Sequence, residues 1–196
     1  MKIRTLTLGA GLLAAALTLA GCTGTGTTDH SGGHSASPAT PAASAATFDD
    51  ADVAFATGMI AHHQQAVDMS DLLLAKDGVD PEVAALAERI KAAQGPEIET
   101  MEQWLASWGH DAGHGGMDHG DGMMSEDDMA ALEEAAGAEA STLFLEQMIV
   151  HHEGAIAMSE TQLADGENPD ALALAERIIA DQTAEIAEMR GMLDAR

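Results

Sequence analysis

The hydrophobic positions of this chain recur with the period of an α-helix, and no stretch alternates between apolar and polar residues as a half-buried strand would. Phe55, Met59, Ala66 and Met69, for example, fall along one stripe of a single helix. Aspartate, asparagine, glycine and proline interrupt the pattern where helices begin and end. The predicted helices span about 49–76, 81–108, 125–136, 138–164 and 169–193. The sequence therefore predicts an all-α protein.

The predicted helices form an internal repeat of two helical hairpins. The segment from Phe55 to Ala75 matches the segment from Phe144 to Ala164 at an offset of 89, and after a one-residue deletion the match continues at an offset of 88. Two hairpins with short turns favour an antiparallel four-helix bundle. A pseudo-twofold axis along the bundle would relate its halves. Repeat one covers residues 49–108, the intervening loop 109–124, and repeat two 138–194.

The N-terminus has the pattern of a targeting signal. Residues 1–21 contain two early basic residues and a short apolar run, and the run ends at Leu19-Ala20-Gly21-Cys22, which resembles a bacterial lipobox. The resemblance implies cleavage before Cys22 and attachment of lipid to that cysteine; an ordinary secretory signal or an uncleaved anchor is the alternative. Residues 22–47 are predicted to be a flexible tether, and 48–196 the bundle domain. The expected location is extracytoplasmic, on the cell membrane.

Charge and cysteine content narrow the chemistry. The formal net charge of −25 argues against nucleic-acid binding and against a basic membrane-surface role. The single cysteine is assigned to the lipid, so the mature chain has no disulfide and no thiolate ligand. A site for a soft metal would have to be built from histidine and methionine.

Each repeat carries adjacent histidines with a methionine upstream. Met59 lies about 4.5 to 6 Å along the helix axis from His62 and His63, close enough to share one ion. Met69 lies about 10 Å beyond His62, which is too far for the same ion. With an axis along the bundle, the second repeat would bring its equivalents to the same level: Met148, His151 and His152.

Thioether and imidazole donors with few carboxylates favour Cu(I), with Ag(I) as a chemical mimic, whereas imidazoles alone also accept Cu(II) or Zn(II). A di-iron site needs Glu-x-x-His, and no carboxylate stands three residues before any of these histidines. The alternative is that the methionines fill the core and the histidines only form hydrogen bonds. The repetition of the whole pattern favours a metal site.

The loop between the repeats is a second candidate. It holds six imidazole or thioether side chains among glycines and aspartates: His110, His114, Met117, His119, Met123 and Met124. Such a composition is typical of loose, exchangeable metal binding. A flexible acidic linker with a chance content of histidine is the alternative.

One acidic position also matches between the repeats, Glu97 in the first and Glu185 in the second. These carboxylates are candidate hydrogen-bond partners of the metal-binding histidines. We favour instead a contact between helices at the end of the bundle.

The pattern Met-Ile-x-His-His-x-x-Ala-x-x-Met, in two copies across residues 55–193, resembles the domain-of-unknown-function 305 family. The resemblance implies a ferritin-like four-helix fold in a secreted or lipid-anchored bacterial protein, and some members are associated with copper binding and resistance. Gly58 is a departure, because relatives often have another methionine there. The residues implicated by the resemblance are Met59, His62, His63, Met69, Met148, His151, His152 and Met158.

The sequence thus predicts a lipid-anchored extracytoplasmic protein that binds and buffers copper, or passes Cu(I) to a partner protein, and has no enzymatic activity. Two alternatives remain open. One is a ferritin-like metal oxidase or peroxide-scavenging enzyme that uses the same histidines. The other is an envelope interaction protein whose histidines are structural.

Overall fold

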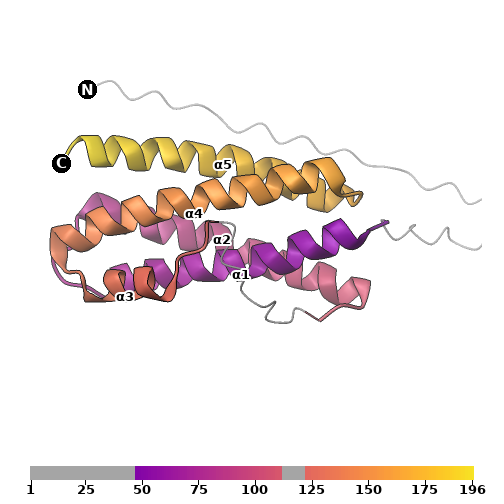
Figure 1. Cartoon of the computed structure of the whole chain (residues 1–196), viewed down its shortest axis with the longest axis horizontal. Helices are drawn as coiled ribbons and strands as arrows, with labels where there is room; N and C mark the ends of the chain where they lie inside the picture. Colours follow the sequence, from indigo (N-terminus) through magenta and orange to yellow (C-terminus); the bar gives the residue numbers. More distant parts are fainter. Residues whose placement is uncertain (1–46, 112–121) are drawn as a thin grey trace, which may run out of the picture. The chain divides into compact units, whose positions relative to one another are not determined.

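The computed structural model describes residues 47–111 and 122–196; the candidate residues Cys22, His114, Met117 and His119 lie outside these ranges. The described residues form helices and no strand. The all-α prediction is confirmed, and every predicted helix is present close to its expected bounds. The helices are α1 (Asp50–Leu74), α2 (Pro81–Trp108), α3 (Glu126–Glu134), α4 (Gly137–Asp165) and α5 (Pro169–Asp194) (Figure 1).

Local capping explains where the long helices begin. Asp49 and Asp52 form a capping box at the start of α1. Asp80 accepts a hydrogen bond from the Glu82 amide at the start of α2, and Asn168 caps α5 in the same way. A proline follows each of these two caps at the first helical position, where its missing N–H costs nothing.

The two hairpins, α1–α2 and α4–α5, meet through α1 and α4, which run antiparallel (Figure 1). Asp52 near the start of α1 bonds Asn168 beyond the end of α4, whereas Leu73 near the end of α1 packs in one cluster with Phe144 near the start of α4. The expectation that a pseudo-twofold axis along the bundle relates the two hairpins is therefore wrong. The axis that relates the hairpins crosses the α1–α4 seam, because α4 starts beside the α1–α2 turn, where Gly137 lies against Gly78.

The core divides into two apolar clusters along the bundle. The α3-side cluster includes Leu132 of α3, and the Trp-side cluster has Trp104 and Trp108 packed against it. Equivalent methionines of the two repeats fall in opposite clusters because α1 and α4 are antiparallel. The α3-side cluster contains Met69, Met124, Met148 and Met189, and the Trp-side cluster contains Met59 and Met101, with Met158 packed against it.

Each repeat also holds the hairpin turn of the other. The buried Asp52 carboxylate accepts hydrogen bonds from the Asn168 amide at 3.0 and 3.1 Å. At the equivalent position of repeat two, the buried Ser141 hydroxyl accepts one from the Asp80 amide at 3.0 Å. These reciprocal contacts satisfy turn amides that would otherwise be buried without partners.

Burial raises the pKa of the Asp52 carboxyl, but its hydrogen bonds outweigh burial and leave the pKa below its ordinary value. The bonds come from the backbone of Asp49, Glu167 and Asn168 and from the Gln162 side chain. The carboxylate therefore stays ionised inside the fold.

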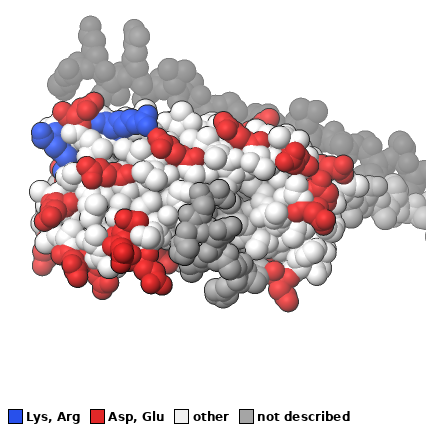
Figure 2. Space-filling view, viewed as in Figure 1, with Lys and Arg blue, Asp and Glu red and all other residues white. Residues whose placement is uncertain are grey.

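The surface of the described part is predominantly acidic. On the face shown in Figure 2, Asp and Glu side chains are spread widely, whereas Lys and Arg gather at one end. None of the described helices combines the length and apolar character that a membrane crossing requires.

Candidate metal centre

Four histidines occupy the middle of the α1–α4 seam, between the two apolar clusters. His62 is 1% exposed, and His63, His151 and His152 are fully buried. The rings of His62 and His151 face each other across the seam with their centroids 3.7 Å apart. The antiparallel packing thus brings both repeated motifs to one level of the bundle.

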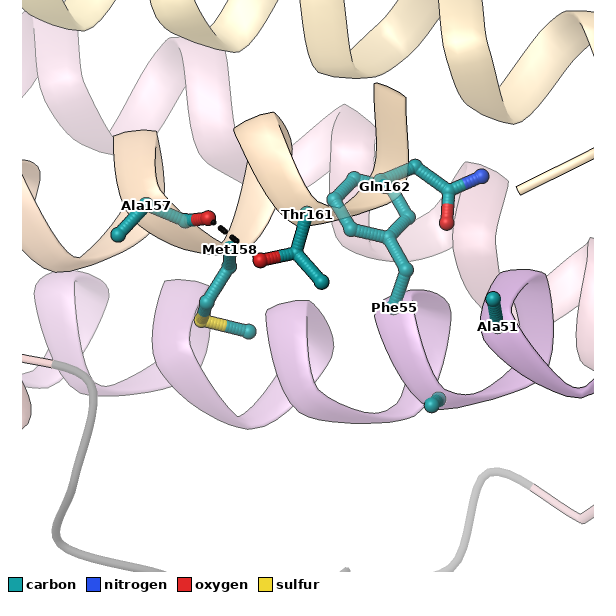
Figure 3. Close-up of a pocket in the computed structure, with 7 residues that line it drawn as sticks. Ala51, Phe55, Ala157, Met158, Thr161 and Gln162 are labelled. Carbon is teal, nitrogen blue, oxygen red and sulfur yellow. Dashed lines mark hydrogen bonds between the residues drawn. The ribbon is translucent and has the colours of Figure 1, made fainter. Parts of the chain in front are cut away.

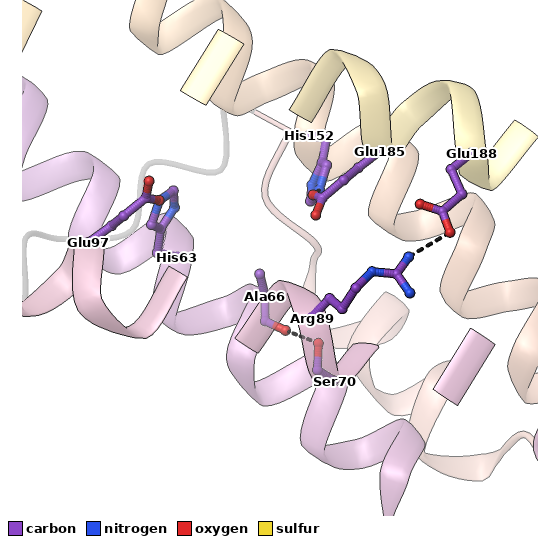
Figure 4. Close-up of polar contacts among 8 residues, drawn as sticks. All are labelled: His63, Ala66, Ser70, Arg89, Glu97, His152, Glu185 and Glu188. Atoms are coloured by element: carbon purple, nitrogen blue, oxygen red, sulfur yellow. Dashed lines mark hydrogen bonds and ion pairs between the residues drawn. The ribbon is translucent and has the colours of Figure 1, made fainter. Parts of the chain in front are cut away.

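The second histidine of each pair turns towards its own hairpin partner, because adjacent positions on a helix differ by about 100°. His63 Nε2 lies 2.8 Å from a carboxylate oxygen of Glu97 on α2. His152 Nε2 lies 2.7 Å from Glu185 on α5 (Figure 4). The expectation that these glutamates only pair helices at a bundle end is wrong, since each contacts a candidate ligand.

This contact orients each imidazole. In the tautomer that donates its Nε2 proton to the carboxylate, the lone pair of the ring lies on Nδ1. The Nδ1 atoms of His63 and His152 are buried and have no hydrogen-bond partner in the described part of the chain. A buried polar atom without a partner is costly in a folded protein, and coordination of a metal would satisfy it.

The electrostatic setting keeps the central ring neutral. Burial, followed by the neighbouring imidazoles of His62, His152 and His63, holds the pKa of the His151 ring well below its ordinary value. A neutral imidazole has a lone pair for a metal ion without first losing a proton.

The two methionines upstream of the histidines do not meet at one height, as an axis along the bundle would have required. Met59 is buried in the Trp-side cluster and Met148 in the α3-side cluster, so they flank the histidines on opposite sides. Met69 is also buried, while its equivalent Met158 is partly exposed. Within residues 47–111 and 122–196, no three His, Cys, Asp or Glu side chains converge on a position for a metal ion.

The end of the His/Met-rich loop reaches this seam. The Met124 amide donates to Gln65 at 2.7 Å and its carbonyl accepts from Gln65 at 2.9 Å, which holds the chain on α1. On α4, Gly122 packs so closely on Gly154 that a Cβ at Gly122 would lie 2.8 Å from the Gly154 Cα. Met124 is thereby buried at the seam, and Met123 beside it is partly exposed.

Gln65 and Gly154 are equivalent positions of the repeat, at the offset of 89. Neither residue was predicted to have a role, although their mismatch inside an otherwise regular repeat was a detectable signal. His110, another candidate of the loop, is exposed and lies edge-on to the Phe48 ring instead, with centroids 6.3 Å apart.

These features define an all-α bundle whose centre holds paired, buried imidazoles with methionine clusters on both sides. The chain belongs to the family described as domain of unknown function DUF305, whose profile matches residues 52–193. No match is found among functionally curated proteins.

Solved structures of the family resemble this chain over nearly their whole length. A DUF305 fragment from Deinococcus radiodurans is 32% identical, with a TM-score of 0.70, and the match covers 77% of this chain and 99% of that one. A Streptomyces coelicolor DUF305 protein described as secreted is 30% identical, with a TM-score of 0.66 and coverages of 74% and 91%. CopM in its Cu(I)-bound form is 31% identical, with a TM-score of 0.64 and coverages of 74% and 96%.

Proposed function

We propose that this protein binds copper as its cargo, with Cu(I) as the preferred state, and that it stores the ion or passes it to a partner protein. The observation that carries the proposal is the pair of buried imidazoles, His63 and His152, each oriented by a glutamate and each with an unpartnered Nδ1. The ion is cargo in this proposal, and the residues that would hold it are the four seam histidines with thioethers from the flanking clusters.

The donor chemistry supports a soft ion. Imidazole and thioether ligands suit Cu(I). CopM, which this chain resembles, has been solved with Cu(I), with Cu(II) and with Ag bound. Cu(II) or Zn(II) would use the imidazoles without the thioethers.

We further propose that the protein acts outside the cytoplasm and is anchored by lipid on Cys22. Support comes from the lipobox-like segment and from the Streptomyces coelicolor relative, whose description names it as a secreted protein. The proposal includes no catalysis. Glu97 and Glu185, the carboxylates that contact the seam histidines, are each engaged by one imidazole, an arrangement suited to holding ligands in place.

The test is an anaerobic Cu(I) titration of residues 23–196 against a competing chelator. A double variant, His63→Ala with His152→Ala, is compared with His110→Ala, which removes an exposed loop histidine, and with a deletion of residues 112–121. Circular dichroism confirms that each variant remains helical.

We expect the double variant to lose tight binding while His110→Ala and the loop deletion retain it. Loss of binding only in the loop deletion would make the bundle a scaffold and contradict the proposed site. Absence of binding in the unmodified protein would contradict copper binding itself.

A further inference from the structure

A groove opens between the first half of α1 and the last half of α4, on the Trp side of the histidines (Figure 3). Its volume is about 370 Å³, and no charged side chain lines it. Its walls include Ala51, Ala54, Phe55, Ala157, Met158 and Gln162. Phe55 is seven residues from His62, so the groove lies about 10 Å along α1 from the histidine level.

The repeat provides an equivalent groove at the other end of the seam, and there it is filled. At the offset of 89, Phe55 corresponds to Phe144 and Met158 to Met69, both fully buried in the α3-side cluster. Leu132 of α3 is fully buried in the same cluster, and Met129 packs against it. Helix α3 therefore covers one end of the seam, while no helix within residues 47–111 and 122–196 covers the groove at the other end.

Gly58 makes the open groove possible. A Cβ at this position would lie 3.0 Å from the terminal methyl of Met158, so the glycine leaves room for the thioether to lie between α4 and α1 (Figure 3). Met158 is partly exposed, unlike its buried equivalent Met69. Behind it, Met59 and Met101 are fully buried in the cluster against which Met158 packs.

A second feature of the groove points to a ligand. Gln162 is 2% exposed, and its amide nitrogen is held by the buried Asp52 carboxylate. The amide oxygen is therefore also held in place, and it is buried without a hydrogen-bond partner in the described residues. It can accept a hydrogen bond from a water or a small ligand that accompanies an ion into the groove.

We propose that this groove is the capture site for a soft monovalent ion, Cu(I) or Ag(I), and that the Met158 thioether is its first ligand. The ion then passes Met59 to reach the buried histidines. This inference rests on the proposed function and adds the route of loading, which uses one end of the seam because α3 covers the other. The uncharged lining selects against strongly hydrated divalent ions, which would lose more hydration on entering.

Loading kinetics test the route. Ala157 is exposed on the groove wall, so Ala157→Leu narrows the groove without altering the core, and Ala92→Leu makes the same change at an exposed position of α2. Stopped-flow transfer of Ag(I) from a chelator should become about tenfold slower in Ala157→Leu, with the equilibrium affinity and the Ala92→Leu rate unchanged. An unchanged rate in Ala157→Leu would overturn the capture site and leave the proposed function standing.

Methionine oxidation, measured first without metal and then with Ag(I), tests the capture site separately from copper affinity. Peptide mapping after mild peroxide treatment should show Met158 oxidised at least several-fold faster than Met69, because only Met158 is accessible. Stoichiometric Ag(I) should slow the oxidation of Met158. Equal oxidation of the two methionines, or no protection by Ag(I) in a protein that binds it, would overturn the inference.

Met158→Leu, compared with Met192→Leu, assigns the ligand; Met192 is also partly exposed and packs against the α3-side cluster. Leucine keeps the apolar volume and removes the sulfur. We expect Met158→Leu to slow loading and Met192→Leu to leave the rate unchanged. The reverse pattern would place capture at the α3 end and overturn the inference.

Discussion

The two ends of the α1–α4 seam are built from the same repeated sequence, yet they differ in what covers them. On the α3 side, Leu132 is fully buried in one cluster with Met69 and Phe144. On the Trp side, the equivalent residues Met158 and Phe55 line an open groove. The middle of the seam, by contrast, stays symmetric, with one histidine–glutamate pair in each hairpin. Duplication thus supplies a symmetric centre, and the connection between the copies makes the ends different.

The segment that connects the two repeats also contacts different residues on α1 and α4. Gln65 bonds the Met124 backbone on α1, and Gly154 accepts the close approach of Gly122 on α4. One chain segment that runs between two equivalent helices cannot make the same contacts with both. The residues at this repeat position, Gln65 and Gly154, therefore differ.

The largest effect is expected where α3 covers the seam. Leu132→Ala should lower the free energy of unfolding by about 2–5 kcal/mol, because it leaves a cavity among fully buried side chains. Chemical denaturation measures this loss, and Leu163→Ala, at a leucine that is 38% exposed, should change stability by less than about 0.5 kcal/mol. Equal effects of the two variants would show that α3 does not close the α3-side cluster.

The symmetric centre can be tested at the glutamates. Glu97→Gln and Glu185→Gln should each weaken Cu(I) binding about 10- to 100-fold, because a neutral amide orients and polarises the imidazole less well than a carboxylate. Chelator competition gives the affinities, and Glu88→Gln, at an exposed glutamate of α2, is the matched control. If only one of these two variants weakened Cu(I) binding, the inferred symmetry of the four-histidine centre would be contradicted.

The reciprocal turn contacts differ in charge and should differ in pH dependence. Asp52→Asn should destabilise the fold by about 1–3 kcal/mol at neutral pH, and Ser141→Ala by about 1 kcal/mol. The pKa of Asp52 is lowered in the folded protein, so its contribution is fully present above the carboxyl's unfolded pKa of about 3.9 and is lost as the pH falls through the lower folded value.

Urea denaturation from pH 7 down to pH 3 should therefore show the difference between wild type and Asp52→Asn shrinking at the acid end, whereas the Ser141→Ala difference stays constant. Asp50→Asn is the control for loss of charge, because Asp50 is an exposed residue in the first turn of helix α1. A pH-independent Asp52→Asn difference would contradict the depressed pKa.

A last effect concerns the chain segment that crosses the seam. Gln65→Ala removes both hydrogen bonds to the Met124 backbone and should cost about 1–2 kcal/mol, at the usual net value of each bond. Hydrogen exchange at the Met124 amide should rise, while Gln64→Ala, at an exposed neighbour, should leave it unchanged. Unchanged protection in Gln65→Ala would mean that Gly122 and Gly154 hold the segment by themselves.

Much of the fold could be predicted because its signals are local. Helix period, the caps at Asp49, Asp80 and Asn168, and the prolines after two of them depend on neighbours in the chain. The repeat of adjacent histidines similarly pointed to the centre of the bundle, where the structure finds all four buried.

The direction in which the second hairpin docks could not be predicted, because both orientations bury the same apolar faces. Antiparallel packing of α1 and α4 separates Met59 from Met148, which an axis along the bundle would have placed together. The contacts of Glu97 and Glu185 could not be decided from the sequence for a similar reason. The match between the two glutamates shows that they are equivalent, but it does not show whether each contacts a histidine or another helix.

The sequence by itself determined the helices, their ends, the duplicated hairpin and the imidazole and thioether chemistry, because each of these is written in short-range spacing. Only the tertiary structure decided that the two His motifs face each other across an antiparallel seam, that glutamates orient two of the rings, and that α3 covers one end of the seam but not the other. Those outcomes depend on contacts between residues far apart in the chain, where docking geometry and the burial of apolar surface choose among arrangements that local spacing leaves equal.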